Sequence, residues 1–152
     1  MLRKFWWLYL KLRGWKPINT FPAEIKSCVL AVAPHTSNED FFLGLAYRRI
    51  FKIDHAKFLG KAELFRPPFG FIFKWLGGTP VYRDSKHNMV EQVVAKFKAD
   101  ANFMLALSPE GTRKKVDKLK TGFYYIAKQA NVPIVMVGLD YANKQLVCSA
   151  PF

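Results

Sequence analysis

The stretch "CVLAVAPHTSNED", Cys28 to Asp40, decides the fold class of this chain. Its first six residues form a continuous apolar run closed by a proline, a pattern typical of a strand buried inside a parallel sheet. A histidine, His35, comes directly after that proline, and a carboxylate, Asp40, follows five residues later. Because ligands of open α/β sheets bind beyond the carboxyl ends of the strands, we expect functional side chains here.

Short apolar runs alternate with helical patterns along the rest of the chain. Further strands are expected to begin at residue 56 and to lie within 77–84, 103–107, 133–139 and 145–149. Helices are expected at 40–51, around the apolar residues 90, 93, 94 and 97, and at 122–130. This alternation predicts an α/β fold, a single layered domain with a mainly parallel central sheet flanked by helices.

The composition is that of one folded unit. The chain has 152 residues, of which 51% are hydrophobic, so it can build a core and is not a disordered protein. Its two cysteines, Cys28 and Cys148, each lie inside an apolar run. We therefore expect buried thiols rather than a disulfide framework, and the cytosol as the natural compartment.

A formal charge of +13 indicates an anionic partner. Nucleic acid, phospholipid headgroups and a phosphorylated small molecule all satisfy that requirement. The chain also has 14 Phe, 4 Trp and 6 Tyr, and aromatic residues beside cations suit a membrane interface as well as base stacking. Charge and composition alone leave these partners open.

The first residues, "MLRKFWWLYLKLRGWK", combine cations with aromatic residues. Their apolar stretches are far shorter than the roughly 20 residues of a spanning helix, and we expect neither a transmembrane segment nor a secretory signal. On a helix, Lys4 and Lys11 lie opposite a broad apolar arc made of Leu2, Phe5, Trp6, Leu8, Tyr9, Leu10 and Leu12. We expect residues 1–17 to form a basic interfacial helix and residues 18–152 the α/β domain; a terminal helix packed on the domain is the alternative.

His35 and Asp40 have the chemistry of a general base and its orienting carboxylate. A neutral imidazole accepts a proton near working pH when a partner fixes its tautomer and stabilises the imidazolium. No nucleophilic side chain of the enzyme accompanies the pair, so the nucleophile would be a hydroxyl of the substrate. The alternative is that Asp40 only caps the helix that follows it.

The segment "SPEGTRKK", residues 108–115, follows another apolar run. Arg113 can contact a phosphate in bidentate fashion, Gly111 lets backbone approach a ligand, and Glu110 can share a crevice with His35. Arg83, at the end of the 77–84 segment, is a second candidate phosphate ligand. An ordinary polar turn and a solvated cation are the alternatives. The neighbouring run of Lys114, Lys115, Lys118 and Lys120 is typical of a solvated face, and on a membrane enzyme it would also attract anionic lipid. A metal site would have to use His35, Asp40 and Glu110, and without a denser ligand cluster we expect none.

Four blocks in order resemble the glycerolipid acyltransferase family, typified by 1-acyl-sn-glycerol-3-phosphate acyltransferases. The histidine, four residues, aspartate block is matched at 35–40, and a glycine-led block ending in arginine at 78–83. A proline-glutamate-glycine-threonine-arginine block is matched at 109–113, and a valine-proline-isoleucine-valine block at 132–135. The chain departs from the family pattern at Ser108, where phenylalanine is usual, at Met136, where proline is usual, and around Tyr82.

The resemblance implies an enzyme of phospholipid biosynthesis that moves a fatty acyl group from an acyl-CoA or acyl carrier protein thioester to a lysophospholipid hydroxyl. The most favoured acceptor is 1-acylglycerol-3-phosphate. His35 would deprotonate that hydroxyl and Asp40 would orient His35, without a cofactor or a covalent acyl-enzyme. The acceptor's glycerol and phosphate would be held by Arg83, Glu110, Gly111, Thr112 and Arg113.

The same resemblance carries expectations about location and extent. The protein would lie on the cytoplasmic face of the cell membrane as a peripheral, monotopic enzyme, bound to an anionic surface and not to nucleic acid. The apolar residues 69–76 would line core, an acyl pocket or a membrane-facing patch. Family members usually continue past the final "SAPF", so the chain would be a compact variant or a truncated piece. A non-enzymatic basic module for membrane or nucleic acid and a metal-assisted phosphohydrolase remain alternatives.

Overall fold

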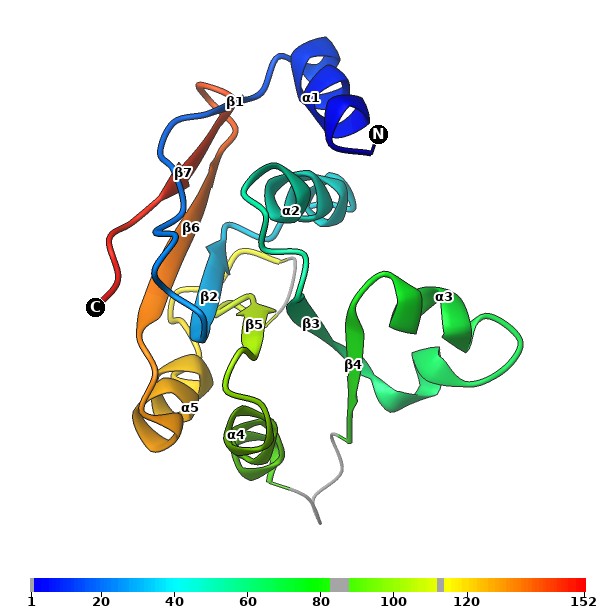
Figure 1. Cartoon of the computed structure of the whole chain (residues 1–152), viewed down its shortest axis with the longest axis vertical. Helices are drawn as coiled ribbons and strands as arrows, with labels where there is room; N and C mark the ends of the chain where they lie inside the picture. The colour runs from blue at the N-terminus through cyan, green and yellow to red at the C-terminus, as the bar shows by residue number, and fades with distance from the viewer. Residues whose placement is uncertain (1, 83–87, 112–113) are drawn as a thin grey trace.

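A seven-stranded, mostly parallel sheet organises the part of the chain that the computed structural model describes, residues 2–82, 88–111 and 114–152 (Figure 1). The strands are β1 (Lys16–Pro17), β2 (Cys28–Ala33), β3 (Ala56–Lys61), β4 (Gly78–Val81), β5 (Met104–Leu107), β6 (Ile134–Asp140) and β7 (Gln145–Cys148). Their order in the sheet is β1-β7-β6-β2-β5-β3-β4. The β6–β7 pair is antiparallel and the other pairs are parallel, which confirms the predicted fold class.

Helices cover both faces of this sheet. They are α1 (Leu2–Arg13), α2 (Glu39–Ile50), α3 (Gly70–Trp75), α4 (Met89–Ala99) and α5 (Gly122–Ala130), with a 3₁₀ turn, η1 (Ala62–Phe65), before α3. Figure 1 shows α1 and α2 on one side of the sheet and α4 and α5 on the other. Among the described residues, none of these helices is both long and apolar enough to cross a membrane.

Strand β2 lies at the centre because its side chains are apolar on both faces. Cys28 and Leu30 belong to the core under α1 and α2, whereas Val29 and Ala31 belong to the core under α4 and α5. This alternation follows from the two-residue period of a strand, and it explains why the run has no polar position. The parallel neighbours β5 and β6 bring three carboxyl ends to one edge of the sheet.

Helix α1 packs on α2 along one side only. Leu10 is fully buried, Trp6 and Tyr9 pack against the core, and Arg13 pairs with Glu39 at the start of α2 at 2.7 Å. The rest of the apolar arc remains exposed, namely Leu2, Phe5, Leu8 and Leu12, together with Trp7. The helix therefore has one side packed on the domain and an apolar surface that remains open.

Candidate active site

His35 and Asp40 come together in the turn between β2 and α2. The Nδ1 atom of His35 lies 3.1 Å from Oδ2 of Asp40. The imidazole is 32% exposed and the carboxylate only 3%, so the pair has one face in the protein and one in solvent. Because Nδ1 faces Asp40, the other ring nitrogen, Nε2, is the atom left to meet a ligand.

The Asp40 carboxylate is held by donors that precede its own helix. Its Oδ2 accepts the backbone N–H of Thr36 at 2.6 Å and of Ser37 at 2.9 Å. Both donors lie in the loop, not in the first turn of α2, so the carboxylate fixes the loop that carries His35 rather than capping the helix. These hydrogen bonds satisfy an oxygen atom of a side chain that is almost fully buried.

Tyr141 is a further member of the site, and it is a residue that sequence reasoning missed. It directly follows β6, and its hydroxyl donates to Oδ1 of Asp40 and lies 3.3 Å from the Ser37 hydroxyl. Trp15 packs edge-on against its ring at 5.0 Å. Burial, and next the hydrogen bond to Asp40, raise the pKa of Tyr141 to about 12, so the phenol stays protonated and able to donate at neutral pH.

Glu110 joins the end of β5 to the end of β2. Its Oε2 accepts the backbone N–H of His35 at 2.8 Å, so the residues that follow β2 and β5 lie close together, although Glu110 itself does not line the cleft described below. This carboxylate therefore helps to position the histidine loop. The substrate contact that the family resemblance implies for Glu110 stays a prediction.

Gly111 and Lys120 lie against each other beyond Glu110. Gly111 has a φ of +65°, and a Cβ there would lie 2.9 Å from the Lys120 side chain. The backbone N–H of Lys120 donates to the carbonyl oxygen of Pro109 at 2.7 Å, which brings this cation to the site, a position that the sequence did not predict. The other expected phosphate ligands, Arg83, Thr112 and Arg113, lie outside the described residues.

A large cleft of about 1330 Å³ opens from this site and runs between α2 and β3. Its lining is mostly apolar and includes side chains from β2, α2, β3 and α3, among them Val32, Phe41, Phe42, Leu45, Phe58, Leu59 and Phe73. Beyond the carboxyl ends of β2 and β5 the cleft is lined by His35, Ser108, Gly111 and Lys120, and we call this part its polar end. The cleft exceeds the usual range of about 300–1,000 Å³ for small-ligand pockets, and its mostly apolar lining with polar residues at one part suits a ligand that has an apolar group and a polar head.

The described side chains do not gather a metal-ligand set. Over residues 2–82, 88–111 and 114–152, no group of three or more His, Cys, Asp or Glu residues is placed to hold a metal ion. Asp40 and Glu110, which the sequence offered for such a site, are bonded to N–H donors of the histidine loop.

Comparison with known proteins gives a family and a fold. The model of a family described as Acyltransferase matches residues 13–140. The crystal structure of the 1-acyl-sn-glycerophosphate (LPA) acyltransferase, PlsC, from Thermotoga maritima has a similar fold, with a TM-score of 0.66 and 19% identity. The similarity covers 99% of this chain and 66% of that one, so the present chain spans less than two thirds of the length of PlsC. Among curated proteins, none matches.

Proposed function

The chain belongs to the Acyltransferase family, and on that premise we propose that it transfers a fatty acyl group from a thioester to the hydroxyl of a lysophospholipid, with 1-acylglycerol-3-phosphate as the favoured acceptor. The observation that carries this proposal is the His35–Asp40 pair at the polar end of an apolar cleft. A general base without an enzyme nucleophile needs a hydroxyl substrate, and the cleft offers room for an acyl chain.

The reaction needs one proton acceptor and no covalent acyl-enzyme. Nε2 of His35 takes the proton of the acceptor hydroxyl, and the oxygen attacks the thioester carbonyl as the proton leaves. A carbon–oxygen bond forms, the carbon–sulfur bond breaks, and the imidazolium returns its proton to the departing thiolate. Asp40 holds the imidazole in the required tautomer and stabilises its cationic form.

Electrostatics favours an anionic head group at the polar end. Lys120 lies at the cleft beside Gly111. We propose that Lys120, with Arg83, Thr112 and Arg113, holds the acceptor phosphate and the phosphates of the donor. Both acyl-CoA and acyl carrier protein present the thioester on a phosphate-bearing arm, so the charge fits either donor.

The exposed side of α1 supports attachment to a membrane surface. Its apolar residues Leu2, Phe5, Leu8 and Leu12 remain open, and the same helix has Lys4 and Lys11 on the opposite side of the apolar arc. Such a helix lies in the headgroup plane, and anionic lipid of the cytoplasmic leaflet attracts its lysines. We propose a peripheral position there, which would bring the cleft to a lipid acceptor.

A thiol-release assay tests the proposed function. Acyl-CoA and acyl carrier protein are each offered with a panel of lysophospholipids, with and without EDTA, and both free thiol and acylated lipid are measured. The proposal expects thiol release that depends on the acceptor and is unchanged by EDTA. Tight, salt-dependent binding without thioester consumption would instead indicate a non-enzymatic basic module, and loss of activity with chelator would indicate a metal-assisted reaction.

Tyr141→Phe is expected to lower kcat/KM by about tenfold, because a hydrogen bond to a charged group contributes about 1.5–3 kcal/mol. The variant keeps the ring against Trp15 and removes only the hydroxyl that donates to Asp40. Without that donor, Asp40 binds the protonated imidazole more strongly, so the acid limb of the pH profile of kcat/KM moves to higher pH. The profile of kcat/KM between pH 5 and pH 9 measures this shift.

The matched control is Tyr125→Phe, at an exposed tyrosine of α5. It should leave both the rate and the profile unchanged. If the Tyr141→Phe enzyme is slower but its pH profile of kcat/KM matches that of the parent, Tyr141 has a structural role only.

A further inference from the structure

An exposed apolar surface covers the crossover between β3 and β4. We call this surface the α3 patch, and its members are Leu64, Phe69, Phe71, Ile72 and Trp75. Phe71 is 69% exposed and Trp75 is 78% exposed, which is costly for large aromatic side chains in water. Figure 1 shows α3 standing out beyond the β4 edge of the sheet, far from the C-terminal end of the chain.

The crossover is packed closely enough to hold this patch in place. A Cβ on Gly70 would lie 2.0 Å from the carbonyl oxygen of Phe65, so η1 and α3 meet at a distance that only glycine allows. Phe65 also packs edge-on against Phe73 at 6.2 Å. The exposed apolar side chains therefore belong to a closely packed turn and helix and not to a loosely packed loop.

One side of the crossover is continuous with the cleft. Phe73 lines the cleft from within α3, and Leu64 both lines it and is 46% exposed. Phe71 and Trp75, on the same short helix as Phe73, do not line the cleft and face outward. We call the part of the cleft lined by Leu64 and Phe73 its apolar end, and a surface that contacts the α3 patch would lie beside it.

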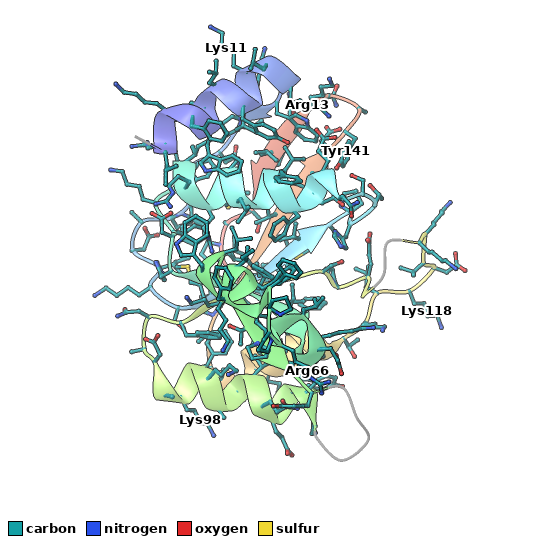
Figure 2. All side chains as sticks on the ribbon, turned by 90° about the vertical axis from the view of Figure 1, so that its right-hand side faces the viewer. Lys11, Arg13, Arg66, Lys98, Lys118 and Tyr141 are labelled. Atoms are coloured by element: carbon teal, nitrogen blue, oxygen red, sulfur yellow. The ribbon has the colours of Figure 1, made fainter. Side chains whose placement is uncertain are left out.

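Cations flank the α3 patch. Lys61, Arg66 and Lys74 are exposed around it, against the single exposed acid Glu63 in residues 61–75. Figure 2 views the molecule from this side, with Arg66 on the face turned toward the reader. Aromatic residues rimmed by lysine and arginine match the apolar boundary and the anionic headgroups of a bilayer. A second copy of this chain, itself at +13, would be repelled.

We propose that the α3 patch is a membrane contact separate from α1, at which an anionic lipid bilayer meets the apolar end of the cleft. The inference rests on the proposed function in taking a lipid as substrate. With α1 and the α3 patch both inserted, the protein is fixed at two places, so the cleft between them keeps one orientation toward the lipid.

Vesicle partition of matched variants tests the proposal. Phe71→Ser and Phe152→Ser remove the same side chain from positions that are both 69% exposed, and β4 and β7 put them toward opposite edges of the sheet. Cosedimentation with vesicles of phosphatidylcholine containing 30 mol% phosphatidylglycerol should fall about tenfold for Phe71→Ser, and further for Phe71→Ser with Trp75→Ser. Phe152→Ser should bind like the parent. Equal binding by all variants, or equal loss in Phe71→Ser and Phe152→Ser, would overturn the proposal.

A second measurement reports on the patch without removing its apolar surface. Trp75→Phe keeps an aromatic ring, so vesicle binding should persist, while quenching of tryptophan fluorescence by brominated lipid should lose the share due to Trp75. If Trp75→Phe leaves the quenching unchanged, the patch does not enter the bilayer. A dimer that dissociates in Phe71→Ser while vesicle binding stays the same would assign the patch to a second copy instead.

Acyl transfer by the parent protein separates the two proposals. If the parent consumes no thioester with any lysolipid, the proposed function fails, and the partition and quenching results still decide whether the α3 patch binds lipid. If transfer is observed and the α3 variants bind vesicles normally, only the membrane contact at α3 fails.

Discussion

Replacing His35 by alanine is expected to lower kcat for acyl transfer by about 10²–10⁴-fold, the range that general-base catalysis contributes. His35 lines the cleft, and no other described imidazole lines it to replace this base. The side chain is about one third exposed, so its loss leaves no cavity in the core. Initial rates of acceptor-dependent thiol release measure the effect, and circular dichroism and vesicle cosedimentation should match the parent.

His55→Ala is the matched control, because His55 is an exposed histidine in the turn before β3. Its rate should equal that of the parent. Transfer retained by His35→Ala would contradict the mechanism, even with the family membership unchanged.

Asp40→Asn is expected to reduce kcat by about 10³–10⁴-fold, by analogy with the loss of the carboxylate that orients histidine in serine proteases. The amide has the same shape, but it cannot stabilise the imidazolium, and its nitrogen cannot accept a hydrogen bond from the loop. Asp40 accepts from Thr36, Ser37 and Tyr141, so one of these contacts must change. We therefore expect a lower midpoint of thermal unfolding in addition to the slower rate, measured by calorimetry and by thiol release.

Asp54→Asn offers the comparison, because Asp54 is a half-exposed carboxylate paired with Arg49 at 3.1 Å. It should change neither the rate nor, to any large extent, the melting temperature, since exposed ion pairs contribute little to stability. An Asp40→Asn enzyme with a normal rate and a lower melting temperature would make Asp40 a structural residue only.

Much of the fold follows from local patterns. The apolar run at 28–33 and the helical pattern at 122–130 predict β2 and α5 with the bounds that the structure has. Strand β1, residues 16–17, could not be predicted, because a two-residue strand exists only through its pairing with β7 far along the chain. The order of the strands also depends on non-local contacts, and no local pattern specifies it.

Part of the site was also predictable from local sequence patterns, and the rest depends on non-local contacts. His35, Asp40 and Glu110 follow apolar runs, and the carboxyl ends of parallel strands meet at one edge, so their proximity follows from the pattern. Tyr141 follows an apolar run too, but only the observed order, with β6 beside β2, shows that it reaches Asp40. Lys120 was missed because a lysine-rich run is usually solvated, and its return to the cleft depends on the backbone contact with Pro109.

Because Tyr141 contacts Asp40, the site cannot be complete until the ribosome has synthesised Tyr141. The two residues are 101 positions apart, and Figure 2 shows Tyr141 and Arg13 toward the same end of the molecule. A ribosome adding about 5–20 residues per second makes Asp40 some 5–20 s before Tyr141. Throughout that interval β2 lacks its partner β6, so one edge of this apolar strand stays without its final hydrogen-bond partners until translation has passed residue 140.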